Sequence, residues 1–185
     1  MARKKKQIKV IPLGGVGEIG KNMTAIEYNN EIIIIDCGMS FPEDYMLGID
    51  AVIPDFTYLE ENRDKIKCLL ITHGHDDHIG AIPYFLKKFP EVPVYGTGLT
   101  LGLVSNKISQ YEDITNANLI RFKAGDVLEF GCFKVRAIKV NHSVADSVAF
   151  AVHTPIGVIV FTGDFKVDFT PVDDEIIDLA QFAAL

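Results

Sequence analysis

Residues 72–80 read Thr-His-Gly-His-Asp-Asp-His-Ile-Gly, and this stretch decides how the rest of the chain is interpreted. It contains three of the five histidines of the chain together with two aspartates. Imidazole nitrogens and carboxylate oxygens are ligands that zinc prefers. The apolar run 68–71 directly before it predicts a strand, and His73 and His75, two apart in an extended chain, then project to the same side. The stretch therefore predicts a metal site beyond the end of a buried strand.

Three further metal-binding side chains follow apolar runs elsewhere in the chain. They are Asp36, His142 and Asp164. Any one alone would be interpreted as an ordinary loop acid or surface histidine, but strand ends that meet at one edge of a sheet would bring all three to the histidine cluster. Together they predict a binuclear metal site. His153, beside a predicted hairpin turn, is interpreted as a loop histidine without a metal role.

Short strands dominate the predicted secondary structure, and helices come between them in batches. Strand-like runs occupy residues 8–13, 23–28, 32–36, 67–72, 92–95, 119–122, 127–130, 133–140, 147–153 and 158–162. Helical patterns occupy residues 56–64, 78–89, 99–111 and 173–185. Turn residues between several strand pairs indicate hairpins. This order favours an α+β fold in which two sheets lie between helices.

The composition is that of one globular domain. The chain has 185 residues, 48% of them hydrophobic, and no apolar stretch of the length that a membrane span needs. No secretion signal is evident. The three cysteines are odd in number and show no C-x-x-C spacing, so neither a disulfide framework nor a thiolate zinc site is indicated. We expect a protein of the reducing cytoplasm without membrane attachment, with Cys37 as a buried structural residue.

The net charge of −7 would ordinarily argue against a nucleic-acid partner. Several of the acids are candidate metal ligands, however, and two bound divalent cations would change −7 to −3 while making the pocket locally positive. The segment 1–7 is basic. It could touch an RNA backbone, but we interpret it as a disordered solubilising tail.

A competing motif lies near the N-terminus. Residues 15–20 satisfy G-x-G-x-x-G, and Asp36 stands where a dinucleotide-binding protein places its ribose-binding acid. Such a site needs a helix after the glycines, whereas residues 21–31 resemble a strand with a tight turn at Asn29-Asn30. We therefore interpret the glycines as allowing the backbone to pass close to the metal pocket or to an anionic substrate.

The order of the candidate ligands resembles that of the metallo-β-lactamase superfamily. Four further stretches resemble its β-CASP branch and within it the ribonuclease J family; they are residues 13–22, 41–44, 48–55 and 162–171. The resemblance implies an αββα sandwich of two mixed sheets between helices, spanning residues 8–185 and incomplete at the C-terminus. It also implies a two-zinc nuclease that cleaves RNA as an endonuclease and as a 5′-to-3′ exonuclease, in RNA processing and decay.

The resemblance also implies a role for each candidate residue. His73, His75 and His142 would hold the first zinc, Asp77 and His78 the second, and Asp164 would bridge both. Asp77, His78 and Asp164 are our candidates for catalysis, by a hydroxide shared between the metals. Asp36 would accept a hydrogen bond from a ligand imidazole and fix its tautomer. Asp76 is expected to face outward and to help cap the helix that begins near His78.

One departure from the family pattern concerns residues beyond the end of this chain. Ribonuclease J supplies a further histidine to the second zinc, and an RNA-clamping β-CASP domain, from sequence after the point that matches Leu185. The apolar helix expected at 173–185 stops without a cap, which also suggests a piece of a longer protein. We expect this piece to bind one zinc more readily than two and to cleave RNA little or not at all. The full-length protein is expected to be a homo-oligomer and to take part in an RNA-decay complex.

Two other functions fit the ligand cluster. The first is hydrolysis of a small molecule, such as a thioester, lactone or β-lactam, by the same metal chemistry. The second is a catalytically silent metal-binding subunit that serves as a scaffold for RNA processing. The stretches that resemble ribonuclease J favour RNA over a small substrate, and the complete set of ligands argues against a silent subunit.

Overall fold

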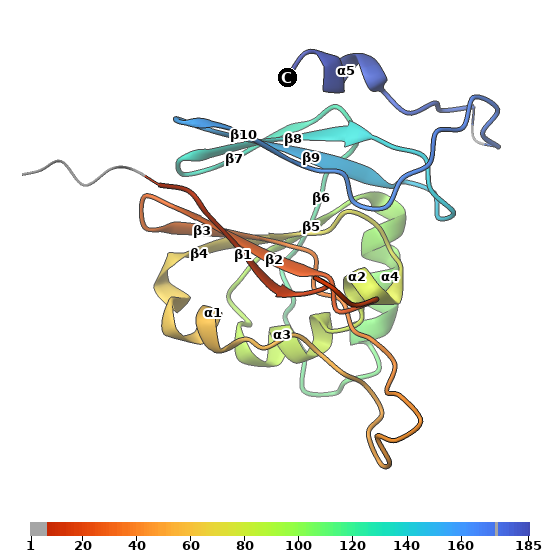
Figure 1. The fold of residues 1–185 in the computed structure, drawn as a ribbon. Coiled ribbons are helices and arrows are strands. Elements are labelled where there is room, and N and C mark those ends of the chain that lie inside the picture. Colours follow the sequence, from red (N-terminus) through yellow and green to blue (C-terminus); the bar gives the residue numbers. More distant parts are fainter. Residues whose placement is uncertain (1–6, 173) are drawn as a thin grey trace, which may run out of the picture.

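The computed structural model describes residues 7–172 and 174–185, which fold into two sheets with helices on their outer faces (Figure 1). The strands are β1 (Lys9–Gly14), β2 (Met23–Tyr28), β3 (Glu31–Ile35), β4 (Ile66–Leu70), β5 (Val94–Gly96), β6 (Leu119–Arg121), β7 (Val127–Phe130), β8 (Phe133–Lys139), β9 (Val148–Thr154) and β10 (Gly157–Phe161). The helices are α1 (Thr57–Glu61), the short 3-10 helix η1 (Arg63–Lys65), α2 (Asp76–Ile79), α3 (Ile82–Lys88), α4 (Gly98–Ile108) and α5 (Leu179–Ala183). The predicted α+β sandwich is confirmed.

The first sheet has six strands in the order β1-β2-β3-β4-β5-β6. Strands β1, β2 and β3 pair antiparallel, whereas β3, β4, β5 and β6 pair parallel, so this sheet is mixed as expected. The isoleucine run of β3 is buried because a sheet covered on both faces leaves no side chain of a central strand in water. The carboxyl ends of β3, β4, β5 and β6 therefore meet at one edge.

The second sheet has four strands in the order β10-β9-β8-β7, and all of its pairs are antiparallel. The prediction of two mixed sheets is therefore wrong for this one. The physical reason lies in its connections. Only residues 131–132 separate β7 from β8, and only residues 155–156 separate β9 from β10. Two-residue turns can join antiparallel strands but not parallel ones.

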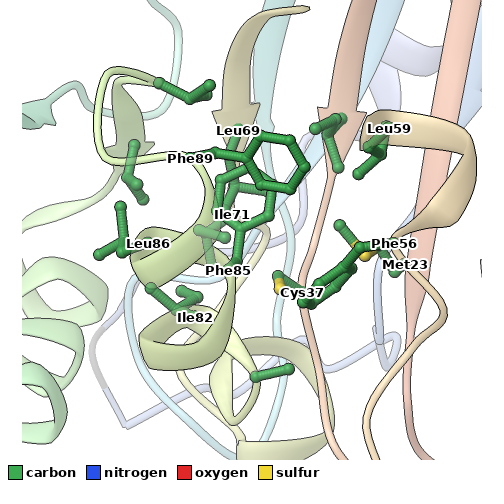
Figure 2. Close-up of a cluster of buried hydrophobic side chains, with 14 of the residues drawn as sticks. Met23, Cys37, Phe56, Leu59, Leu69, Ile71, Ile82, Phe85, Leu86 and Phe89 are labelled. Carbon is green, nitrogen blue, oxygen red and sulfur yellow. The ribbon is translucent and has the colours of Figure 1, made fainter. Parts of the chain in front are cut away.

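Three apolar cores separate the layers. The largest lies between the first sheet and helices α1 to α4, where Phe56, Phe85 and Phe89 stack edge-on or tilted against one another (Figure 2). A second core fills the space between the two sheets. The third is small and lies on the outer face of the second sheet, where Phe182 of α5 packs beside Ile177. The order of layers is thus helix, sheet, sheet, helix.

The glycine motif at residues 15–20 leads into a hairpin and not into a helix. Strands β2 and β3 pair antiparallel through a turn in which Asn29 and Asn30 both have positive φ. This local geometry is the one that the asparagine pair predicts. The crossover helix of a dinucleotide site is absent from this part of the chain, which the structure describes fully.

The helix predicted over residues 78–89 is two helices. Helix α2 begins two residues earlier than predicted, at Asp76, and residues 80–81 separate it from α3. The Ala81 amide donates to the carbonyl oxygen of Cys37 at 2.9 Å instead of to its own helix. Pro83 has no N–H to continue the helical ladder. Both effects break the helix at the same place.

The helix predicted over residues 173–185 is shorter than expected. Its first residue lies outside the described residues, and α5 begins only at Leu179. The segment before it pairs with the end of β8 instead: Ile177 N–H donates to Asn141 Oδ1 at 2.7 Å, and Asp178 N–H donates to the Lys139 carbonyl at 3.1 Å. These bonds hold the segment extended.

The basic tail predicted at residues 1–7 lies almost wholly outside the described residues. Among the helices that the structure describes, none combines the length and the apolar character needed to cross a membrane. The described chain contains no disulfide, because Cys37, Cys68 and Cys132 are all free thiols. Burial raises the pKa of the Cys37 thiol well above its usual value, and the neighbouring Asp36 charge adds to this effect. Cys37 is therefore a protonated core residue.

Candidate metal centre

The candidate ligands meet at the edge where the parallel strands end. Asp36 follows β3, and the loop that carries His73 and His75 follows β4, its parallel neighbour. Open parallel sheets place ligand sites at this edge. The second sheet contributes His142, from the long connection between β8 and β9, and Asp164, just after β10. The two sheets therefore supply one site from opposite sides.

Three imidazoles and one carboxylate form the first group. Nε2 of His73 and Nε2 of His142 each lie 3.1 Å from Nδ1 of His75. Oδ2 of Asp164 lies 3.6 Å from Nε2 of His142, and the ligand atoms of the four residues all lie within 4.8 Å of one another. A neutral ring nitrogen offers one lone pair or one proton, so Nδ1 of His75 cannot form two full hydrogen bonds. A cation among the three nitrogens would bind all of them.

Two aspartates and one imidazole form the second group. Nε2 of His78 lies 3.5 Å from Oδ2 of Asp77 and 3.6 Å from Oδ1 of Asp164. The three ligand atoms lie within 4.8 Å of one another. Asp164 thus belongs to both groups and turns a different oxygen toward each.

The spacing of these atoms fits a tetrahedral cation. Bonds of about 2.0–2.2 Å from zinc to nitrogen or oxygen place neighbouring ligand atoms about 3.4 Å apart. Three pairs in the first group and two in the second, at 3.1–3.6 Å, agree with that separation, and the other pairs lie within 4.8 Å. The donor set of imidazole and carboxylate also suits a borderline metal better than calcium or magnesium.

Asp36 and Thr72 hold two of the imidazoles in position from behind. Oδ2 of Asp36 lies 2.8 Å from Nδ1 of His78, so this nitrogen donates and Nε2 keeps its lone pair facing Asp77 and Asp164. The Thr72 hydroxyl donates to the Asp36 carboxylate at 2.9 Å and lies 3.0 Å from Nδ1 of His73. Its single proton goes to the carboxylate, so it accepts from His73 Nδ1, which leaves Nε2 of that ring free as well.

Asp36 reaches this position by an unusual backbone conformation. Its φ is +60°, a left-handed value that aspartate tolerates better than most residues. The carboxylate is buried and also accepts from the Thr72 amide at 2.8 Å. Strained residues of this kind gather at functional sites.

The electrostatics of the site keep His73 and His142 neutral. Burial, together with the neighbouring imidazoles, lowers the pKa of His73 to about 2. Burial also lowers the pKa of His142, although the Asp164 charge opposes it. Burial would lower the pKa of His78 too, but the charge and hydrogen bond of Asp36 outweigh it and raise the pKa. Neutral imidazole is the form that binds metals.

Two residues that sequence reasoning missed, Thr72 and Asn22, belong to the site. The amide nitrogen of Asn22 lies 3.2 Å from both Oδ2 of Asp77 and Nε2 of His78. Thr72 directly precedes the histidine cluster, a position that could have drawn attention to it. Asn22 directly follows the glycine loop and Lys21, but nothing in its surroundings predicts a partner about fifty-five residues away.

Asp76 differs from its predicted role. It is the first residue of α2, and the cap position belongs to His75, whose side chain makes no capping hydrogen bond. The Asp76 carboxylate faces outward as expected, but it pairs with Lys107 of α4 at 2.8 Å. His153 lies in β9, outside both ligand groups.

Comparison with known proteins shows what the chain is similar to. A sequence profile of the metallo-β-lactamase superfamily matches residues 16–178. Ribonuclease J of Synechocystis is 45% identical over 177 residues, which are 95% of this chain and 28% of that protein. Ribonuclease J 1 of Streptococcus pyogenes is 46% identical and ribonuclease J2 of Bacillus subtilis is 44% identical, and the match covers 98% and 97% of this chain and 32% of each relative. The chain thus spans about a third of the length of these curated relatives.

Solved structures share the fold at lower identity. A protein of unknown function from Enterococcus faecalis superposes with a TM-score of 0.68 at 20% identity, over 88% of this chain and 44% of that one. The metallo-β-lactamase fold protein YhfI from Bacillus subtilis superposes with a TM-score of 0.58 at 20% identity, over 86% of this chain and 63% of that one. The layered fold, the paired ligand groups and a family match over most of its length agree, and the chain belongs to the metallo-β-lactamase superfamily.

Proposed function

We propose that this chain is part of a zinc-dependent ribonuclease that hydrolyses RNA phosphodiester bonds, both as an endonuclease and as a 5′-to-3′ exonuclease, in RNA processing and decay in the cytoplasm. One observation carries the proposal: Asp164 turns Oδ1 toward His78 and Oδ2 toward His142, each at 3.6 Å. A carboxylate in that position can link two cations, and paired cations are suited to displacement at phosphorus. The names of the curated relatives support RNA as the substrate.

In this proposal His73, His75, His142 and Asp164 hold the first zinc, and Asp77, His78 and Asp164 hold the second. When bound, two zinc ions supply Lewis-acid stabilisation of the negative charge that develops on the phosphate oxygens. Asp36 and Thr72 keep the metal-facing nitrogens of His78 and His73 unprotonated. Asp77, His78 and Asp164, which would hold the second zinc, are our candidates for catalysis.

The two groups differ in how completely this chain supplies them. The first has four residues and the second has three. In addition, the side-chain amide nitrogen of Asn22 lies 3.2 Å from both Oδ2 of Asp77 and Nε2 of His78. It would have to move before a cation could bind these two atoms. We therefore propose that this chain retains one zinc, in the first group, more readily than two.

We also infer that the chain is one segment of a longer protein, because the curated relatives are about three times as long. The homo-oligomeric state and the RNA-decay complex stay predictions for that longer protein.

Cleavage of a 5′-monophosphorylated single-stranded RNA by the zinc-loaded protein of full length tests the proposed function. We expect zinc-dependent cleavage that is lost in His75→Ala, whereas the matched variant His153→Ala keeps it because that ring lies outside both ligand groups. The 185-residue chain alone should cleave the RNA little. Hydrolysis of a thioester or lactone without cleavage of RNA would contradict the proposal and favour a small-molecule hydrolase.

A further inference from the structure

A basic cavity lies at the same sheet edge as the metal centre, beyond the end of β6. It has a volume of about 180 Å³, and its charged lining residues include Arg121, Lys123, Lys139, Asp146 and Glu175. Strands β4, β5 and β6 are successive neighbours in the first sheet. Because neighbouring strands lie about 4.8 Å apart, the end of β6 is about 10 Å from the end of β4, which leads into Thr72 and His73.

The cavity and the metal centre also share their walls. Val148, which lines the cavity, donates from its amide to the carbonyl oxygen of Thr72 at 3.0 Å. The connection between β8 and β9 carries His142 at the metal centre. It ends in Asp146 and Ser147, which line the cavity. The cavity and the metal centre are therefore neighbours along this sheet edge.

Both acids of the cavity are already engaged. Oδ2 of Asp146 accepts from the Leu99 amide at 3.1 Å, and Glu175 pairs with Lys139 at 2.9 Å. The remaining charged groups are two cations, Arg121 and Lys123.

These two cations are unusual in this protein. Of the lysines and arginines in the described ranges, all form an ion pair except Arg121, Lys123 and Arg136. Arg121 and Lys123 are exposed, and buried Phe122 between them anchors this stretch in the core between the sheets. Residues two apart in an extended chain project to the same side, so both cations turn away from that core.

The Arg121 guanidinium lies against the first residue of α4, the helix that follows β5. A Cβ placed on Gly98, the first residue of α4, would lie 2.8 Å from Nη2 of Arg121. The charge is thus directed toward the side on which the metal centre lies.

We propose that Arg121 and Lys123 form a phosphodiester-binding subsite, which holds the backbone of a single-stranded RNA while another of its phosphates lies at the metal centre. The inference rests on the proposed function for the identity of its ligand. The subsite would contact a phosphate of the same strand other than the one at the scissile bond.

Salt dependence of RNA binding tests the subsite. The ligand is a fluorescein-labelled phosphorothioate RNA decamer, which keeps a charge on each linkage and resists hydrolysis. Its affinity for the zinc-loaded chain is measured by fluorescence anisotropy over a series of salt concentrations. Each phosphate contact contributes about 0.7 to the slope of log affinity against log salt on a single strand. We expect the Arg121→Ala/Lys123→Ala variant to reduce the slope by about 1.4, whereas the double variant Arg121→Lys/Lys123→Arg should keep it.

Arg136→Ala is the matched control. Among the described residues Arg136 also forms no ion pair, but it lies in β8 on the same face as Ile138, on the outer side of the second sheet toward α5. The salt-dependence slope of the Arg136→Ala variant should equal that of the unchanged chain. An unaltered slope in the Arg121→Ala/Lys123→Ala variant, an equal loss in Arg136→Ala, or no RNA binding by the unchanged chain would each overturn the subsite. A different result is that the Arg121→Ala/Lys123→Ala variant lowers the slope as expected while the full-length protein cleaves no RNA. That result would overturn the proposed function and leave the subsite standing.

Discussion

Asp36 tests the site at the scale of one residue, because its carboxylate fixes the proton of His78 without facing the metal position. Asp36→Asn is the suitable change, since asparagine tolerates the positive φ of this position. The amide cannot supply the charge that holds the proton on Nδ1 of His78. We expect zinc affinity to fall by about 10- to 100-fold, the usual effect of removing a group that orients a ligand. Competition with a chromophoric chelator measures it.

Asp55→Asn is the control for that prediction. Asp55 is an exposed carboxylate that accepts from the Thr57 amide at 2.8 Å, remote from both ligand groups. Its zinc affinity should match that of the unchanged protein. Equal affinities in both variants would show that Asp36 does not orient His78.

The ligands themselves could be predicted from the sequence, whereas their supports could not. Histidines and aspartates packed into six positions are rare enough to identify a metal site from their spacing alone. The contacts of Asn22 with Asp77 and His78 depend on how two segments about fifty-five residues apart cross in space. No local pattern contains that information, because the crossing is determined by the packing of β3 and its extension against α2.

At the scale of elements, the contact between Gly38 and α2 determines where Asp77 lies. A Cβ on Gly38 would lie 1.5 Å from the carbonyl oxygen of Asp77. This oxygen accepts a hydrogen bond from the backbone N–H of Asn22 at 3.0 Å. Gly38→Ala must therefore push α2 away from the extension of β3. We expect a destabilisation of about 1–3 kcal/mol, as for other overpacked sites, together with weaker zinc binding. Urea denaturation measures the free energy of unfolding.

Gly102→Ala is the same substitution in α4, and we expect it to have the opposite effect on stability. Gly102 lies in α4, is exposed, and has nothing within 4 Å of an added Cβ. Alanine in a helix interior is more stable than glycine by about 0.5–1 kcal/mol, so this variant should be more stable than the unchanged protein. If the two alanine variants changed stability in the same direction, the close contact at Gly38 would not control α2.

Helices and strands could be located from the sequence more reliably than their first and last residues could. Apolar runs placed every strand within about two residues of its observed position, since strands buried on one or both faces need apolar side chains. The helix breaks at residues 80–81 and before α5 have another origin. They arise where a backbone group bonds to a distant segment, such as Ala81 to Cys37 or Asp178 to Lys139.

At the scale of the whole molecule, Glu27 links stability to pH. This buried carboxylate of β2 contacts Lys9 at 2.6 Å, Tyr58 of α1 at 2.5 Å, and Lys65 of η1 at 3.4 Å. Burial alone would raise its pKa, but the hydrogen bonds from Lys9 and Tyr58 and the charges of both lysines lower it from 4.5 to about 2.

A depressed pKa contributes stability above the unfolded value of 4.5, and this contribution is lost as the pH falls toward 2. Glu27→Gln should therefore cost about 1–2 kcal/mol at pH 7, after allowance for screening of the half-exposed Lys9, and the difference should shrink below pH 4. Glu129→Gln, whose carboxylate is 71% exposed, should show little change at any pH. Denaturation curves from pH 3 to 7 measure both, and a constant difference for Glu27→Gln would contradict this prediction.

The layers of the whole molecule could be predicted from the order of elements, but strand order and surface charge could not. Whether a sheet is mixed or antiparallel depends on long-range pairing, and the all-antiparallel second sheet is the example here. The net charge of −7 likewise conceals two cations at one sheet edge that form no ion pair with the described residues. Only the fold separates Arg121 and Lys123 from the acids that neutralise most other lysines and arginines.

The central claim is that Asp164 joins two metal sites, and anomalous diffraction at the zinc edge tests it most directly. In crystals of the chain equilibrated with excess zinc, we predict two peaks about 3.5–4 Å apart on either side of the Asp164 carboxylate. The peak among His73, His75 and His142 should be the stronger. A single zinc that Asp164 does not touch, or two zinc ions that do not share this carboxylate, would contradict the account.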